Sequence, residues 1–232
     1  MKIALLGYGK MGKTIEKIAV SRGHSIVIKA DTNTDYNIKE ADIAIDFSVP
    51  NAAYNNISNC LFHDVPVISG TTGWLKDYDK AVALCNEKQG AFIYASNFSL
   101  GVNIFFELNK VLSQLMKGLP QYKISLEEIH HTQKLDAPSG TAISLANEII
   151  KHSEYTGWTI DSPKSNELGI TAKRIENVPG THKITYHSNV DDIQIKHTAH
   201  NREGFALGAV IAAEWLLGKK GVYSMKDVLN IG

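Results

Sequence analysis

The chain has 232 residues, and 44% of them are hydrophobic, which is enough to bury one large core or two modest ones. Lysine and arginine total 24, as do aspartate and glutamate, so the formal net charge is zero and the strongly basic composition of nucleic-acid binders is excluded. No apolar run approaches the roughly 20 residues of a membrane span, and the N-terminal run is too short for a signal peptide. We therefore expect a cytoplasmic protein that binds neither nucleic acid nor membrane.

The first part of the chain alternates short apolar runs with helical patterns. Five continuous apolar runs predict strands, at Lys2–Leu6, Ser25–Ala30, 43–47, 65–69 and 91–95. Helical periodicity at 11–21 and 75–89 predicts helices that end at Gly23 and Gly90. Continuous rather than alternating apolar strands are typical of a parallel sheet covered on both faces. Residues 1–100 are therefore predicted to form a Rossmann-like, doubly wound α/β domain.

The pattern changes after about residue 100. Helices are predicted at 102–117 and 141–152, and strands at 122–131, 170–175, 182–187 and 192–198. Residues 153–168 are polar and are predicted to be irregular. The pattern indicates a second, smaller α+β domain over 101–202, with a mixed sheet open on one face. The apolar helix predicted at 204–217 is expected to return, with the rest of 203–232, to the first domain.

The two cysteines of the chain, Cys60 and Cys85, are far apart and belong to no CxxC or metal-ligand spacing. Both are expected to lie reduced inside helices, in keeping with a cytoplasmic location. The sequence therefore predicts neither a disulfide nor a metal site.

A glycine motif of the form GxGxxG follows the first predicted strand and opens the first predicted helix. Its residues, all expected to contact the cofactor, are Gly7, Tyr8, Gly9, Lys10, Met11 and Gly12. Gly7 permits a tight turn, Gly9 lets the backbone approach a pyrophosphate, and Gly12 lets the helix pack closely on the strand. Because a helix N-terminus also offers N–H donors to phosphates, the motif predicts a nicotinamide dinucleotide site.

An acidic residue stands where the adenosine ribose is expected. Asp31 lies 19 residues after Gly12, at the end of the second predicted strand, and its carboxylate suits the ribose hydroxyls. A carboxylate repels a 2′-phosphate and Thr32 carries no charge, whereas Lys10 has the reach and the charge to bind one. We expect both NADH and NADPH to serve, with NADH no worse than NADPH.

Two polar loops follow further predicted strands, at the carboxyl edge where open α/β sheets bind ligands. The residues of these loops assigned to the cofactor are Gly70, Thr71 and Thr72, and Ala95, Ser96, Asn97 and Phe98. The threonine hydroxyls suit a nicotinamide carboxamide or ribose.

Residues 127–142 hold the densest group of chemistry-bearing side chains. Within a strand, the adjacent residues His130 and His131 face opposite sides of the sheet, so they are unsuited to binding one metal ion together. Lys134 is a compact cation suited to a substrate carboxylate or to proton donation. Gly140 and Thr141 follow Ser139 at a helix start, where free backbone N–H groups attract an anion. These parts describe a pocket for a small carboxylated substrate beside an acid.

The sequence closely resembles the dihydrodipicolinate reductase (4-hydroxy-tetrahydrodipicolinate reductase) family of the diaminopimelate route to lysine. The resemblance lies in 7–12, 46–48, 70–73, 97–103, 128–142, 197–202 and 205–209, and the HHxxKxDAPSGTA run is its most specific part. Segment 174–182 departs from the family's arginine- and glycine-rich turn, and the chain is short for the family.

The resemblance implies an NAD(P)H-dependent oxidoreductase that reduces a cyclic dicarboxylate, 4-hydroxy-tetrahydrodipicolinate, to tetrahydrodipicolinate. It makes His130 a proton donor or acceptor and Lys134 a proton donor or substrate-binding cation. It assigns His131, Gly140 and Thr141 to substrate binding. It also implies a homotetramer built through the sheets of the second domains.

Other functions also fit a dinucleotide site. A dehydrogenase of another cyclic imine or semialdehyde is one, but semialdehyde dehydrogenases need a nucleophilic cysteine, and both cysteines lie away from the 127–142 motif. A non-catalytic NAD(H)-binding redox sensor is another, although a sensor has no need of the His-His-x-x-Lys run. A metal-dependent hydrolase is a third alternative, but the sequence has no HExxH motif or comparable spacing of metal ligands.

Overall fold

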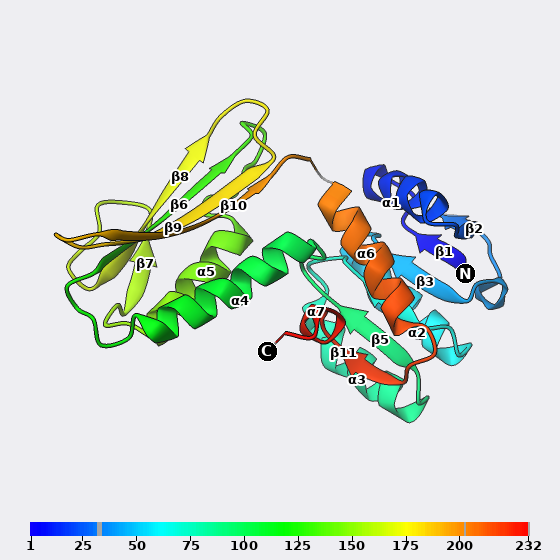
Figure 1. Cartoon of the computed structure of the whole chain (residues 1–232). Helices are drawn as coiled ribbons and strands as arrows, with labels where there is room; N and C mark the ends of the chain where they lie inside the picture. The colour runs from blue at the N-terminus through cyan, green and yellow to red at the C-terminus, as the bar shows by residue number, and fades with distance from the viewer. Residues whose placement is uncertain (32–33, 202, 232) are drawn as a thin grey trace. The chain divides into compact units, whose positions relative to one another are not determined.

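The structure is a computed structural model that describes residues 1–31, 34–201 and 203–231 (Figure 1). It divides into two compact units. Unit 1 consists of Met1–Asn103 and Glu203–Gly232, and unit 2 consists of Ile104–Arg202. None of the described helices is long and apolar enough to cross a membrane.

Unit 1 is built on a six-stranded sheet with the order β11-β5-β4-β3-β1-β2. The strands are β1 (Lys2–Leu6), β2 (Ser25–Ala30), β3 (Ile43–Asp46), β4 (Val67–Ser69), β5 (Ala91–Tyr94) and β11 (Gly221–Tyr223). All of the strand pairs are parallel. The predicted Rossmann-like parallel sheet is confirmed, although the short edge strand β11 was not predicted.

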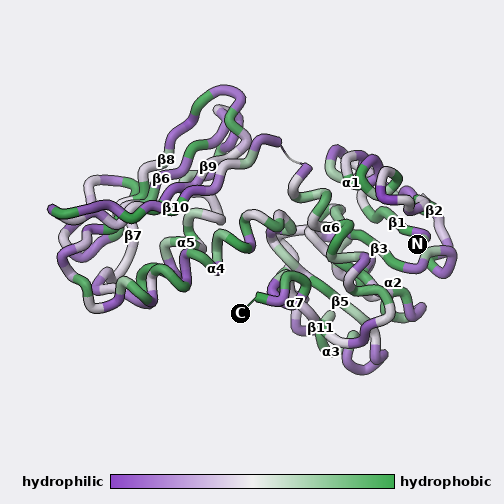
Figure 2. The backbone as a smooth tube through the Cα atoms, viewed as in Figure 1, coloured by the Kyte–Doolittle hydropathy of each residue, from purple (hydrophilic) through white to green (hydrophobic). Residues whose placement is uncertain are grey.

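Helices cover both faces of this sheet. They are α1 (Lys10–Ser21), α2 (Pro50–Phe62), α3 (Tyr78–Glu87), α6 (Glu203–Leu216) and α7 (Met225–Leu229). Apolar residues of α1, α6 and α7 form one buried cluster, and those of α2 and α3 form the other. The helix predicted at 75–89 begins instead as a 3-10 turn, Leu75–Asp77, before α3. Figure 2 shows the hydrophobic character of α6 and of the central strands.

Unit 2 is built on a five-stranded mixed sheet with the order β10-β9-β6-β8-β7. Its elements are α4 (Leu100–Leu115), whose first residues belong to unit 1, β6 (Lys123–His130), α5 (Gly140–Lys151), β7 (Gly157–Thr159), β8 (Glu167–Arg174), β9 (Gly180–His187) and β10 (Asp192–Ala199). β6 is parallel to β8 and antiparallel to β9. The irregular structure predicted for 153–168 is wrong at β7 and at the first residues of β8, while the residues between these strands are irregular.

One face of the unit 2 sheet is covered. Leu126, Ile170 and Ile184 pack with apolar residues of α4 and α5 in a single buried cluster. The opposite face carries charged residues such as Glu127, Lys173 and Lys183, and the tube along β10 is largely hydrophilic in Figure 2. The predicted mixed sheet that is open on one face is therefore confirmed.

Candidate active site

The glycine motif forms the turn between β1 and α1. The N–H groups of Gly7 and Tyr8 both donate to the Ala30 carbonyl, at 2.9 and 3.1 Å. Gly7 has a φ of +97°, and a Cβ on it would overlap the Phe47 carbonyl oxygen. Gly9, by contrast, precedes α1 as its N-cap and a Cβ there would meet open space. The turn is therefore rigid on the sheet side and open at the start of the helix, where a phosphate binds best.

The side chains of the motif differ in what they contact. The Tyr8 hydroxyl donates to Glu16, and Glu16 pairs with Lys29 at 2.6 Å, so the Tyr8 ring is fixed against α1 and β2. Lys10 is exposed, and Met11 packs partly against the apolar core. Asp31 is exposed at the end of β2, where its N–H donates to Thr34 Oγ1 at 2.9 Å. Thr32 lies outside the described residues.

Asp46, at the end of β3, organises the neighbouring loops. The carboxylate is fully buried and accepts hydrogen bonds from four side chains, Ser48 Oγ at 2.6 Å, Ser69 Oγ and Thr71 Oγ1 at 2.8 Å, and Asn56 Nδ2 at 2.9 Å. The Thr71 hydroxyl also accepts from Ser48 N. Because that hydroxyl is engaged twice within the protein, Thr71 fixes the 70–73 loop, while Thr72 is exposed.

The loop after β5 is held in the same way. Asn97 Oδ1 accepts from Ser99 N, and the Asn97 carbonyl accepts from Asn103 Nδ2, both at 2.9 Å. Phe98 is buried against Phe47, with ring centroids 5.8 Å apart. Ala95 N donates to the Ser69 carbonyl, and Ser96 is exposed. Because the strands are parallel, the loops after β1 to β5 lie at the same, carboxyl, end of the sheet. The cofactor residues predicted in unit 1, including Asp31 after β2, therefore lie along that end.

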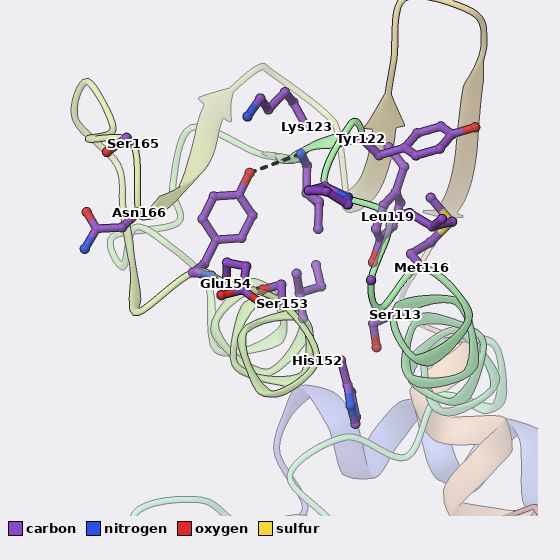
Figure 3. A pocket seen from close by; sticks show the side chains of 16 residues that line it. Ser113, Met116, Leu119, Tyr122, Lys123, His152, Ser153, Glu154, Ser165 and Asn166 are labelled. Atoms are coloured by element: carbon purple, nitrogen blue, oxygen red, sulfur yellow. Dashed lines mark hydrogen bonds between the residues drawn. The ribbon is translucent and has the colours of Figure 1, made fainter.

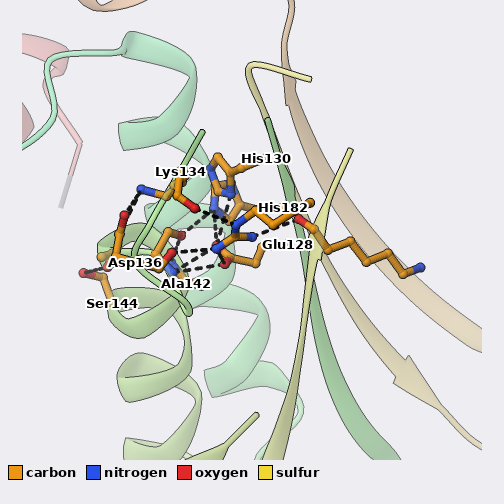
Figure 4. A network of polar contacts seen from close by, with 11 residues as sticks. Glu128, His130, Lys134, Asp136, Ala142, Ser144 and His182 are labelled. Atoms are coloured by element: carbon orange, nitrogen blue, oxygen red, sulfur yellow. Dashed lines mark hydrogen bonds and ion pairs between the residues drawn. The ribbon is translucent and has the colours of Figure 1, made fainter. Parts of the chain in front are cut away.

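In unit 2 the centre of the predicted site is a buried carboxylate, Glu128 on β6 (Figure 4). Both of its oxygens accept from Ser139 N at 3.1 Å, and Arg174 Nη2 lies 3.3 Å from Oε1. His130 Nδ1 lies 3.4 Å and His182 Nε2 3.7 Å from Oε2. Burial alone would raise the pKa of Glu128, but hydrogen bonds from His182 and Ser139 and the nearby His130 lower it to about 2.

His130 is the last residue of β6 and is 8% exposed. Burial lowers its pKa to about 4, although the Glu128 carboxylate opposes the shift, and the positive charges of Lys134 and Arg174 add to the lowering. The His130 ring also packs edge-on against His182, with centroids 5.1 Å apart. A neutral His130 at physiological pH is a poor proton donor.

Lys134 lies in the loop that follows β6. Its ammonium donates to both oxygens of Asp136, at 2.8 and 2.9 Å, and its side chain is only 23% exposed. Asp136 is far more exposed, at 59%. An incoming substrate carboxylate is therefore expected to take the place of the Asp136 carboxylate on Lys134.

His131 and the start of α5 complete the set of residues predicted in unit 2. His131 lines a cavity of about 470 Å³ together with Glu176, Asn177 and Pro179. Ser139 caps α5 by accepting from Ala142 N at 3.2 Å, and Gly140 and Thr141 form the first turn of that helix. The structure thus places His130, Lys134, Gly140 and Thr141 around Glu128, with His131 at the adjoining cavity.

Sequence reasoning missed the roles of Glu128, Arg174 and His182. A usable signal was present for Glu128, because the covered positions of β6 alternate and a carboxylate follows Leu126 in that series. Arg174 and His182 arrive from β8 and β9, through pairing that the sequence does not reveal.

Ligand atoms of Glu128, His130 and His182 lie within 4.8 Å of one another, a spacing that invites comparison with a metal site. The Glu128 carboxylate is already engaged by the Ser139 N–H and by the Arg174 cation. A second cation at this carboxylate would face the guanidinium at close range. The donor set fits a hydrogen-bonded network better than it fits a metal ion.

A larger cavity, of about 610 Å³, lies near the C-terminal ends of α4 and α5 (Figure 3). Met116, Tyr122 and His152 are among its lining residues. None of the predicted site residues lines it, so cavity size alone would have pointed away from the Glu128 network.

The buried His130 predicts a pH dependence of stability. An unfolded histidine titrates near 6.5, whereas His130 stays neutral down to about pH 4, so below pH 6.5 the unfolded state binds a proton that the folded state does not. The free energy of unfolding should fall by about 2–3 kcal/mol as the pH drops from about 6.5 to about 4. Urea titrations over this range should show a loss that is larger by this amount in wild type than in His130→Gln; parallel curves would contradict the assignment.

Comparison with known proteins agrees with the sequence resemblance. The family model described as dihydrodipicolinate reductase, N-terminus, matches residues 1–98, and the one described as its C-terminus matches 101–229. A 4-hydroxy-tetrahydrodipicolinate reductase from Christiangramia forsetii is 58% identical over 234 residues, covering 99% of this chain and 98% of the relative. One from Archaeoglobus fulgidus is 34% identical over 261 residues, covering 99% and 100%.

A solved structure also shares the fold. A dipicolinate-bound dihydrodipicolinate reductase from Paenisporosarcina sp. TG-14 matches with a TM-score of 0.81 at 19% identity, covering 97% of each chain. At that identity the likeness bears on the fold alone.

Proposed function

The chain belongs to the dihydrodipicolinate reductase family, and we propose that it reduces 4-hydroxy-tetrahydrodipicolinate to tetrahydrodipicolinate with NADH or NADPH. This reaction belongs to the diaminopimelate route to lysine. The observation that carries the proposal is the Lys134–Ser139–α5 arrangement around Glu128, because it gives a dinucleotide-binding chain a place for a small dicarboxylate.

Unit 1 is assigned to the cofactor, which supplies the hydride when bound. The open backbone at Gly9 and the N–H groups of the first turn of α1 bind the pyrophosphate. Asp31 binds the adenosine ribose. Asp46 holds the 70–73 loop in place at the edge of the sheet, so that the loop needs little rearrangement when the nicotinamide arrives.

Unit 2 is assigned to the substrate. Lys134 and His131 bind carboxylates, and the N–H groups of Gly140 and Thr141 bind one at the helix start. Addition of a hydride and a proton, with the 4-hydroxyl leaving as water, balances the reaction. Because burial keeps His130 neutral, we assign the proton to Lys134 and assign His130 to holding the pocket in shape.

The proposal is tested by mixing NADH or NADPH with freshly generated 4-hydroxy-tetrahydrodipicolinate. The absorbance of the reduced nicotinamide should decay in proportion to enzyme concentration. No decay with either cofactor, from a protein that binds NADH, would overturn the proposal and favour a non-catalytic NAD(H) sensor.

The alternative of a semialdehyde dehydrogenase needs a nucleophilic cysteine, and neither Cys60 nor Cys85 is suited to that role. Cys60 lies in α2 and Cys85 in α3, both buried, and burial raises the pKa of both thiols. A thiol with a raised pKa is a weak nucleophile at neutral pH.

The cofactor preference follows from the charges near Asp31. We expect kcat/KM with NADH to equal or exceed that with NADPH, because the Asp31 carboxylate repels a 2′-phosphate while exposed Lys10 keeps NADPH usable. Steady-state kinetics with each cofactor measures this, and Asp31→Asn should raise kcat/KM for NADPH only. A hundredfold preference of the wild type for NADPH would defeat the assignment.

The assembly and location of the chain stay predictions. A homotetramer through the open face of the unit 2 sheet and a cytoplasmic location fit a biosynthetic reductase. Light scattering after size-exclusion chromatography measures the assembly, and a monomeric mass would contradict it.

A further inference from the structure

Arg174, at the end of β8, contacts the loop that carries Lys134. Its Nε donates to the Lys134 carbonyl at 3.2 Å, and its Nη2 donates to the Asp136 carbonyl at 2.6 Å. The strand register places Arg174 opposite His130, so the guanidinium starts from the same level of the sheet as the loop. One rigid fork of donors thus holds two carbonyls on either side of Leu135.

Glu128 contacts the far end of the same loop. Its two oxygens accept from the N–H of Ser139, the residue that caps α5, and Glu128 Oε1 lies 3.3 Å from Arg174 Nη2. Ser139 Oγ also lies 3.2 Å from His182 Nε2, on β9. The middle of the 131–139 loop and its end at Ser139 are therefore tied to one ion pair that bridges β6 and β8.

We propose that Glu128 and Arg174 are positioning residues for the reduction. Their ion pair fixes the 131–139 loop and so sets the place of Lys134 relative to the N–H groups of Gly140 and Thr141. The proposal rests on the proposed function for its kinetic consequence, but the restraint on the loop is measurable without turnover.

The same two strands supply a matched control. Glu127 and Lys173 form an ion pair on the open face of the sheet, one residue before Glu128 and Arg174 in each strand. Neither side chain contacts the 131–139 loop through the bonds seen in the described part of the chain. Lys173→Gln therefore removes a cation from β8 without touching the loop.

The kinetic test compares Arg174→Gln with Lys173→Gln. Displacing a reacting group by about 1 Å costs up to about a hundredfold in rate, so Arg174→Gln should lower kcat at least tenfold. The NADH Kd should stay unchanged, because the cofactor is assigned to unit 1. Arg174→Lys keeps the charge without the fork, so it should also lose turnover, and it serves if Arg174→Gln does not fold. Lys173→Gln should match wild type in kcat when the two proteins are compared at the same oligomeric mass, because Lys173 lies on the face assigned to assembly.

Two further measurements need no catalysis. Hydrogen–deuterium exchange should accelerate in 131–139 in Arg174→Gln and Glu128→Gln, while exchange in β6 and β9 stays slow. Calorimetry with pyridine-2,6-dicarboxylate as a stable dicarboxylate probe should show at least tenfold weaker binding to Glu128→Gln. If wild type binds the probe and protects the loop but reduces no substrate, the proposed function fails while the positioning role survives.

The proposal is overturned by either of two results. One is unchanged kcat and unchanged loop exchange in the Arg174 variants. The other is faster exchange throughout unit 2, which would make the ion pair a general stabilising element. A double variant, Glu128→Gln with Arg174→Gln, should be no slower than the worse single variant. Either single substitution already breaks the ion pair, so the second has no further effect on the loop.

Discussion

Replacing Lys134 by alanine should lower kcat by about a hundredfold or more, the range expected when a positioned general acid is removed. Lys134 is the cation of the site with an exposed partner, Asp136, which a substrate carboxylate is able to replace. His130 cannot substitute for it near neutral pH, because burial lowers the His130 pKa to about 4. The NADH Kd, measured by quenching of the cofactor fluorescence, should not change.

Two comparison variants show whether Lys134→Ala loses activity because a proton donor is missing or because the structure is disturbed. Lys151→Ala removes an exposed lysine that pairs with Glu148 at the other end of α5, and should leave kcat unchanged. His130→Gln loosens the pocket that His130 holds in shape, and should lower kcat by at least tenfold, but by less than Lys134→Ala. A Lys134→Ala enzyme as active as wild type, or one slower only through a raised NADH Kd, would remove Lys134 from the mechanism.

The fold of unit 1 was predictable because its signals are local. Each of β1 to β5 is a continuous apolar run, and the glycine motif lies between the first strand and the first helix, where a dinucleotide turn belongs. β7 and β11 were not predictable in this way. Each has three residues at the edge of its sheet. β11 pairs with β5, which is distant in sequence, and β7 pairs with the first residues of β8, which precede the strand predicted at 170–175.

The residues of the unit 2 site were predictable only in part. His130, Lys134 and Gly140 lie within one short stretch of the sequence, so their residue types indicate a substrate-binding site. What the sequence did not reveal is their environment, since Arg174 reaches them through a parallel strand pair and His182 through an antiparallel one. The environment changes the chemistry, because a buried neutral His130 beside Glu128 is a poorer proton donor than the resemblance implies.

The second large effect is expected from alanine substitutions in the glycine turn of unit 1. Gly9→Ala should lower the thermal stability only slightly, since a Cβ there meets open space and alanine is a poorer N-cap than glycine, but should raise the NADH Kd about tenfold or more. The reason is that a methyl group would obstruct hydrogen bonds from the backbone to a charged pyrophosphate, each of which contributes roughly 1.5–3 kcal/mol. Scanning calorimetry and fluorescence titration measure the two quantities on the same sample.

Gly12→Ala should give the opposite pattern. Gly12 lies inside α1, where alanine favours the helix by about 1 kcal/mol in isolation. A Cβ there would overlap the backbone carbonyl oxygen of Gly7. Gly7 has little freedom to shift, because its N–H is bonded to Ala30 and it has no room for a Cβ beside the Phe47 carbonyl. Overpacking of this kind costs about 1–3 kcal/mol or more, so the Tm should fall by several degrees despite the better helix propensity.

The contrast between these two glycines decides what the motif does in this chain. If Gly9→Ala weakens NADH binding with little change in Tm while Gly12→Ala lowers the Tm by several degrees, the turn has one glycine for the ligand and one for the fold. A Gly9→Ala protein with normal NADH affinity would mean that the pyrophosphate does not approach the backbone at α1. The assignment of unit 1 to the cofactor would then have to rest on the loops after β3, β4 and β5, whose side chains are mostly engaged within the protein.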